Sequence, residues 1–137
     1  EDYLDALAWA ESVGGQKGLI ARADKNAKLI HDWIARTPWI ANLAEDRATW
    51  SNTSVCLKIA DPTIAALAPE AQAAFAKDIV SLLDKENAAK DIGSYRDAPA
   101  GLRIWTGSTV EAADVEALLP WLDWAFAVTK AKLAKAA

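Results

Sequence analysis

Apolar residues recur at helical spacing in four segments of the chain, and short runs of β-prone residues separate these segments. The spacing predicts helices over residues 2–13, 16–36, 69–87 and 115–135. The intervening runs predict short strands over residues 39–43, 53–59, 91–95 and 102–105. Because strands so few and short do not make a complete doubly wound sheet, we expect an α/β domain of the α+β type: a small, mostly antiparallel sheet covered by helices.

Glycine and proline mark where the predicted helices begin and end. Gly14-Gly15 closes the first helix, which the chain therefore enters partway along. Thr37-Pro38 ends the second helix, and Asp61-Pro62 can cap a short helical turn after the strand at 53–59. Pro120 is expected to kink the last helix or to mark its first turn.

The charge pattern limits the classes of partner. Acidic and basic residues alternate along the chain with a net charge of -4, and they form no basic stripe of the kind that binds a phosphate backbone. We therefore expect no nucleic-acid partner. No apolar run approaches the roughly 20 residues of a bilayer-spanning helix, and the first residues do not resemble an export signal, so we expect no membrane partner.

Methionine, cysteine and histidine are rare or absent. The chain has no methionine, even at position one, which predicts that translation begins upstream of Glu1 and that the chain is a fragment or a processed product. Cys56 alone can form no intramolecular disulfide, which suits a cytoplasmic location, and we predict that it is a small buried hydrophobe within its strand. His31 has no companions at metal-ligand spacing, so we interpret it as a surface or half-buried helix residue and expect no metal site.

Seven tryptophans are present, and most are expected to pack in the hydrophobic core. Those in predicted helices should pack on the buried face rather than stack on a ligand: Trp9, Trp33, Trp121 and Trp124. The others lie in or near strands and loops, where one could line a cleft: Trp39, Trp50 and Trp105.

Arg103 is the residue that most clearly requires an anionic partner. An arginine within an apolar strand is costly unless its planar guanidinium meets a carboxylate or phosphate. From the residues alone, the partner is either an internal Asp or Glu, which is the more common arrangement, or a bound ligand. Tyr95 and Arg96 precede it across a turn rich in proline and glycine, and Arg96 by itself is typical of a solvated loop residue. No nucleophilic triad accompanies these residues.

Three segments resemble the phosphoserine aminotransferase family, and together they span nearly the whole chain: DYLDALAWAESVGG at 2–15, SNTSVC at 51–56 and YRDAPAGLRIW at 95–105. The resemblance implies the carboxy-terminal small domain of a class V, fold-type I aminotransferase that uses pyridoxal 5'-phosphate. It places residues 1–14 at the end of the interdomain helix and residues 15–137 in the small domain. It also implies a homodimer, with amino-acid and oxo-acid substrates.

The resemblance assigns substrate-binding roles to three residues. Arg103 matches the arginine that holds the substrate α-carboxylate, and Arg96 matches an arginine that meets the substrate phosphate. Tyr95 stands where the family has a histidine, and it can donate one hydrogen bond to the phosphate but carries no positive charge. The catalytic lysine and the cofactor cup belong to the missing large domain. The chain is therefore expected to hold no catalytic, cofactor-binding or metal-binding residue and to be inactive alone.

The expected reaction of the full-length enzyme belongs to serine biosynthesis. It interconverts 3-phosphohydroxypyruvate plus glutamate with phosphoserine plus 2-oxoglutarate. Two alternatives remain at this point. One is the small domain of a related class V enzyme of the alanine–glyoxylate type, whose substrate has no phosphate. The other is a free-standing ligand-binding or interaction module.

Overall fold

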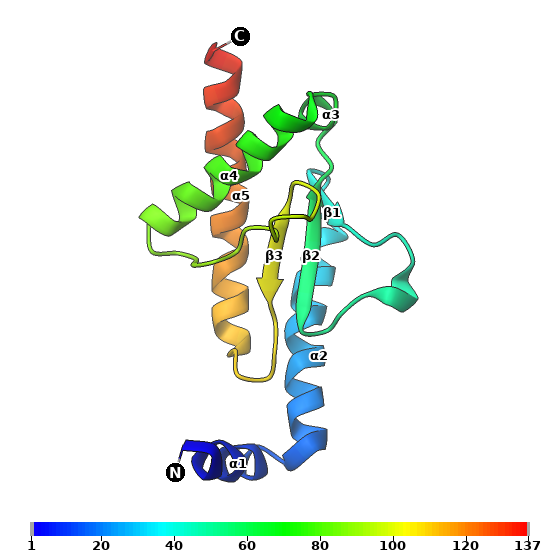
Figure 1. Cartoon of the computed structure of the whole chain (residues 1–137), viewed down its shortest axis with the longest axis vertical. Helices are drawn as coiled ribbons and strands as arrows, with labels where there is room; N and C mark the ends of the chain where they lie inside the picture. The colour runs from blue at the N-terminus through cyan, green and yellow to red at the C-terminus, as the bar shows by residue number, and fades with distance from the viewer. Residues whose placement is uncertain (1, 137) are drawn as a thin grey trace.

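The structure, a computed structural model, describes residues 2–136, and it combines helices with a small sheet (Figure 1). In chain order the elements are α1 (Asp2–Ser12), α2 (Gly15–Ile34), β1 (Ile40–Asn42), the 3-10 turn η1 (Arg47–Thr49), β2 (Ser54–Ile59), α3 (Pro62–Ala65), α4 (Pro69–Lys85), β3 (Leu102–Trp105) and α5 (Ala112–Ala136). The four long helices and the short turn capped by Asp61 were predicted from the sequence and are confirmed.

The sheet has the strand order β1-β2-β3, and both pairings are antiparallel. Val55 and Leu57 of β2 pair with Ile104 and Leu102 of β3, and all four side chains are buried. Because side chains alternate along a strand, the residues between them lie on the opposite face of the sheet. The predicted small antiparallel sheet is confirmed, and one of its faces supplies the core.

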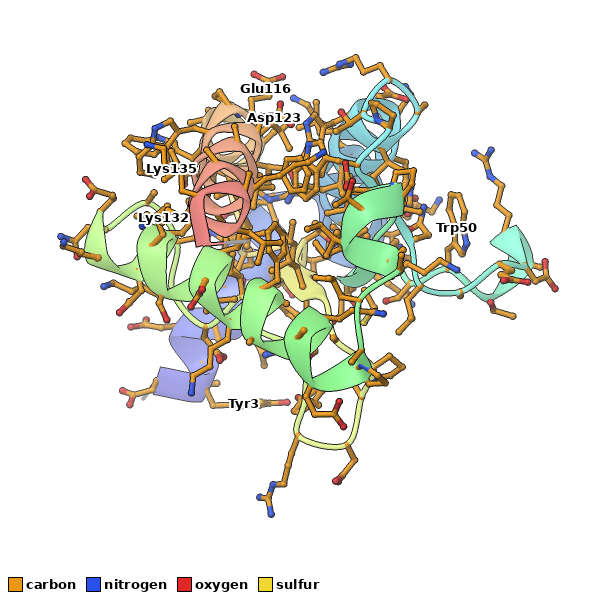
Figure 2. All side chains as sticks on the ribbon, turned by 90° about the horizontal axis from the view of Figure 1, so that it is seen from above. Tyr3, Trp50, Glu116, Asp123, Lys132 and Lys135 are labelled. Atoms are coloured by element: carbon orange, nitrogen blue, oxygen red, sulfur yellow. The ribbon has the colours of Figure 1, made fainter. Side chains whose placement is uncertain are left out.

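Helices α2 and α5 lie side by side and run in the same direction along the sheet (Figure 1). In the first half of α2, the Arg22 side chain donates to the carbonyl of Ser108, just before α5. Further along, the Asp123 carboxylate of α5 accepts hydrogen bonds from Trp33 Nε1 at 3.2 Å and Trp39 Nε1 at 2.8 Å. Figure 2 shows Asp123 on the side of α5 that is turned toward α2. These contacts fix the two helices to each other along their length.

The core lies between these helices, the sheet and α4. Trp39 stacks on Phe126 with ring centroids 4.3 Å apart, and Phe75 of α4 meets the same Phe126 ring edge-on at 5.8 Å. Ile79 and Leu83 follow Phe75 at helical spacing and are fully buried. Burial of a side chain of this size stabilises the fold by about 1.5–3 kcal/mol, so the apolar face of α4 accounts for its position across α5.

Helix α1 leaves the body of the domain at an angle to α2 (Figure 1). Gly14 and Gly15, at the break, have positive φ angles of 100° and 60°, a conformation that side chains disfavour. A β-carbon on Gly18 would collide with the carbonyl of Val13, so the two helices can meet closely only through glycine. No residue of α1 is buried, and Tyr3 and Leu4 are 76% and 68% exposed.

One prediction about secondary structure was wrong. The strand expected at 91–95 is reduced to one isolated bridge between Gly93 and Leu102, because Asp91 has a positive φ of 52° that interrupts an extended backbone. Of the two roles expected for Pro120, a kink or the first turn of the last helix, the second is excluded, since α5 begins at Ala112 and continues through Pro120. Within residues 2–136, none of the helices has the length and apolar character needed to cross a membrane.

The prediction that the helical tryptophans pack in the core holds only for Trp33, which is 2% exposed. Trp9, Trp121 and Trp124 are 38–40% exposed. Trp9 lies on α1, which has no buried residue. On α5 the buried positions, such as Leu122 and Phe126, recur at helical spacing, and this leaves Trp121 and Trp124 on the other side, where their rings contact each other at 5.4 Å.

Candidate functional site

The three residues predicted to bind substrate lie at one place in the fold, on β3 and the loop before it. Arg103 is in the middle of β3, and Tyr95 and Arg96 are in the loop that follows the Gly93 bridge. The guanidinium carbon of Arg103 lies over the Tyr95 ring, 4.5 Å from its centroid. A cation at this distance from an aromatic face is attracted by the electron-rich ring.

The loop is attached to the sheet at both ends. The backbone N–H of Arg103 donates to the carbonyl of Ile92 at 2.8 Å. At the other end, Gly101 lies so close to β2 that a β-carbon there would overlap the carbonyl of Leu57. The turn between Tyr95 and Arg103 therefore depends on glycine at position 101, and this turn determines where the site residues sit.

The Arg103 side chain is 17% exposed and has one internal acidic partner. Its Nη2 donates to Asp91 Oδ2 at 3.3 Å, and the Asp91 side chain is 92% exposed. Arg103 Nε is buried and has no hydrogen-bond partner within residues 2–136. The internal acid considered from the residues alone is thus present, yet it leaves a buried donor of the guanidinium unsatisfied. An unsatisfied guanidinium N–H of this kind can still donate a hydrogen bond to an anion.

Arg96 is exposed and lines a shallow pocket of about 310 Å³ between the loop and α4. Lys77 and Val80 of α4 line the opposite side of the same pocket, beside Ser94 and Tyr95. Arg96 forms no side-chain hydrogen bond or ion pair within residues 2–136. Two cationic side chains at one pocket favour an anion there. Sequence reasoning did not single out Lys77, because α4 and the loop become neighbours only in the folded chain.

The prediction that Cys56 is buried was wrong, because Cys56 is exposed. It pairs with Arg103 across β2 and β3, and cross-strand partners lie on the same face of a sheet. The apolar residues Val55 and Leu57 on either side of it occupy the buried face. Cys56 therefore marks the solvent-facing side of the sheet, the side on which Arg103 is found.

His31 is half-buried, as predicted, and belongs to a separate cluster at the loop between β1 and β2. Its ring lies 4.6 Å from that of Trp50, and the Arg47 guanidinium lies 5.4 Å from the Trp50 ring. Figure 2 shows Trp50 on the side of the molecule away from α5. Burial, and to a smaller degree the charge of Arg47, lowers the pKa of His31 below its ordinary value of 6.5.

No metal centre is formed by these clusters. Across residues 2–136, no group of three His, Cys, Asp or Glu side chains is placed to hold an ion. Arg103 and Arg96 supply cations and hydrogen-bond donors at the loop and β3, and such groups can bind and orient a ligand with carboxylate or phosphate groups.

Curated relatives match nearly the whole chain. The phosphoserine aminotransferase of Methanosarcina mazei is 43% identical over 130 residues, which make up 95% of the chain and 32% of that relative. The phosphoserine aminotransferase of Methanosarcina barkeri is 45% identical over 132 residues, with the same coverage. Over its matched length, the chain is similar to these phosphoserine aminotransferases. The chain spans about a third of the length of these relatives.

Solved phosphoserine aminotransferases share the fold of the chain. The enzyme from Bacillus circulans subsp. alkalophilus superposes with a TM-score of 0.71 at 21% identity, over 88% of the chain and 30% of that structure. A pyridoxal-phosphate-bound phosphoserine aminotransferase from Trichomonas vaginalis gives a TM-score of 0.66 at 18% identity, over 85% of the chain and 30% of that structure. No family model matches the sequence.

Proposed function

We propose that the chain is the carboxy-terminal small domain of a phosphoserine aminotransferase of serine biosynthesis. The full-length enzyme would interconvert 3-phosphohydroxypyruvate plus glutamate with phosphoserine plus 2-oxoglutarate. The observation that carries the proposal is the identity of 43–45% to two phosphoserine aminotransferases across 95% of the chain. The placement of Arg103 and Arg96 on one loop-and-strand unit adds support, because the substrate has both a carboxylate and a phosphate to bind.

In this proposal Arg103 binds the α-carboxylate that phosphoserine and glutamate share. Nε and Nη2 share one edge of its guanidinium, and a carboxylate that replaces Asp91 at Nη2 and reaches the unpartnered Nε would accept two parallel hydrogen bonds. Arg96 binds the phosphate at the pocket it shares with Lys77, where the positive charges of two side chains act on the same anion. Tyr95 comes directly before Arg96 in the chain and its ring lies beside Arg103, so its hydroxyl can donate to the phosphate while its ring supports Arg103.

The residues of this chain do not fit pyridoxal phosphate as a resident cofactor. The lysine that such an enzyme uses is desolvated, which makes its amine a nucleophile near neutral pH. Across residues 2–136 every lysine is exposed or half-exposed, and Lys58, Lys90 and Lys130 are each in ion pairs with an acid. The proposal therefore places the cofactor and the catalytic lysine in the rest of the enzyme, and the isolated chain should be inactive.

The proposal also accounts for the apolar residues that are exposed on α1. Tyr3, Leu4 and Leu7 form an uncovered face on α1, where the family resemblance places the interdomain helix. An uncovered apolar face of this kind is typical of a surface that another domain covers. We propose that the missing large domain covers it in a homodimeric cytoplasmic enzyme.

The proposal is tested by comparing the full-length enzyme with the isolated chain. The full-length enzyme should transaminate phosphoserine with 2-oxoglutarate much faster than alanine with glyoxylate, which would distinguish it from the related class V enzyme. The isolated chain should give a folded circular dichroism spectrum and no activity. A stoichiometric visible absorbance with added pyridoxal phosphate, which borohydride abolishes while it leaves the pyridoxyl group covalently bound to the chain, would contradict the assignment of the cofactor to the rest of the enzyme. Equal activity with alanine would contradict the substrate assignment.

A further inference from the structure

Asp91 occupies the part of Arg103 that a substrate carboxylate would use. Asp91 Oδ2 accepts from Nη2 of Arg103 at 3.3 Å. Nε and Nη2 form one edge of the guanidinium, and a carboxylate that binds this edge with both oxygens makes two parallel hydrogen bonds. Asp91 makes only one of the two, because Nε remains without a partner.

We propose that Asp91 is a resident carboxylate that holds Arg103 in the absence of substrate and is displaced by the α-carboxylate. This inference rests on the proposed function, since it takes Arg103 as the substrate-binding arginine. A substrate carboxylate that takes the place of Asp91 and reaches Nε as well as Nη2 satisfies a donor that Asp91 leaves unpaired, and this favours the exchange. An unsatisfied buried donor is costly, whereas an exposed single-contact ion pair contributes little.

The Asp91 side chain is placed so that it can move away from Arg103 easily. It is 92% exposed, so water solvates its carboxylate as soon as it moves away from Arg103. The Arg103 side chain, by contrast, is only 17% exposed and lies beside the Tyr95 ring. Arg103 is therefore the fixed member of the pair and Asp91 the exchangeable one. In this role Asp91 lowers the apparent affinity for every substrate that has an α-carboxylate.

The test is the kinetics of the full-length enzyme with Asp91→Asn. Residue 91 has a positive φ of 52°, a conformation that asparagine adopts at least as readily as aspartate, so this change removes the charge and keeps the backbone. We expect KM for both phosphoserine and glutamate to fall about two- to fivefold, the range for loss of a competing exposed ion pair, with kcat unchanged. The difference in KM between Asp91→Asn and the wild type should become smaller as the salt concentration rises from 0.05 to 0.5 M, since salt screens the ion pair between Asp91 and Arg103 in the wild type.

Two variants serve as matched controls. Asp91→Glu retains a carboxylate, and its KM should lie closer to the wild type than that of Asp91→Asn; its thermal melting measures what glutamate costs at the positive φ of residue 91. Asp97→Asn removes one exposed negative charge from the same loop, and it should change KM less than Asp91→Asn because, within residues 2–136, the acid that forms an ion pair with Arg103 is Asp91 and not Asp97.

The outcomes separate this inference from the function on which it rests. An unchanged or raised KM in Asp91→Asn, in an enzyme that Arg103→Ala strongly impairs, would overturn the resident carboxylate and leave the proposed function intact. Normal kinetics in Arg103→Ala would overturn both. An equal fall in KM for Asp97→Asn would show a general effect of loop charge and would also overturn the inference.

Discussion

The guanidinium carbon of Arg103 lies 4.5 Å from the centre of the Tyr95 ring, so the ring covers one face of the cation. This contact gives Tyr95 a second possible task besides donating a hydrogen bond to a phosphate. The ring restrains the plane of Arg103, and that plane determines how a carboxylate can approach the two nitrogens of its edge. The two tasks depend on different atoms of Tyr95 and can be separated by substitution.

Tyr95→Phe retains the ring and removes the hydroxyl, whereas Tyr95→Leu removes both. We expect Tyr95→Leu to lower kcat/KM for phosphoserine and glutamate alike by about two- to fivefold, which corresponds to the 0.5–1 kcal/mol of an exposed cation–π contact. Tyr95→Phe should leave the glutamate reaction within about twofold of the wild type and reduce only the phosphoserine reaction. A loss of glutamate activity in Tyr95→Phe equal to that in Tyr95→Leu would exclude the supporting role of the ring.

Gly101 positions the loop that contains Tyr95 and Arg96. A β-carbon at this position would overlap the Leu57 carbonyl, which is backbone and cannot rotate away. We expect Gly101→Ala to lower the free energy of unfolding by about 2 kcal/mol or more, a cost typical of forced overpacking, and to impair substrate binding. Gly93→Ala is the control, because its nearest neighbour would be Val80 Cγ2 at 3.9 Å. Chemical denaturation of the two variants measures the difference, and equal stabilities would contradict the close approach.

The sequence allowed most of the scaffold to be predicted, since helical spacing and proline or glycine stops are local signals. The position of Gly14-Gly15 at the end of α1 and the Asp61 cap of α3 are examples. The errors at Cys56, Trp121 and Trp124 have one cause: composition shows that a residue is apolar but not which face of its element the rest of the fold covers. For Cys56 the alternation of β2 would have been the better guide.

The candidate site could be predicted in its residues but not in its contacts. Arg103 and Arg96 were identified through the chemistry of arginine and the family resemblance. The acid beside Arg103 was anticipated only as some Asp or Glu, because Asp91 comes from a segment that was expected to be a strand. The sequence pattern did not identify Lys77 as a site residue, since its position in the same pocket as Arg96 depends on how α4 crosses the domain.

His31 gives the stability of the chain a pH dependence near neutrality. Its pKa is lowered in the folded state, chiefly by burial, so the unfolded chain binds a proton that the folded chain does not. The free energy of unfolding should therefore fall as the pH decreases from 7 through 6.5 toward 5.5, a window above the range in which carboxylates titrate. His31→Gln should flatten this slope in thermal melts of the isolated chain. Identical slopes in the two proteins would contradict the prediction.

The most direct test of the central claim is kcat/KM for each half-reaction in the full-length enzyme with Arg103→Lys, Arg103→Ala and Arg96→Ala. Because phosphoserine and glutamate share an α-carboxylate, both Arg103 variants should impair both substrates, with alanine worse than lysine and a loss of about 2 to 4 kcal/mol in transition-state binding. Arg96→Ala should impair phosphoserine more than glutamate, because only phosphoserine carries the phosphate. Thermal melting of each variant controls for folding. Normal kinetics together with a large fall in melting temperature for Arg103→Ala would contradict the account and make Arg103 a structural ion-pair residue.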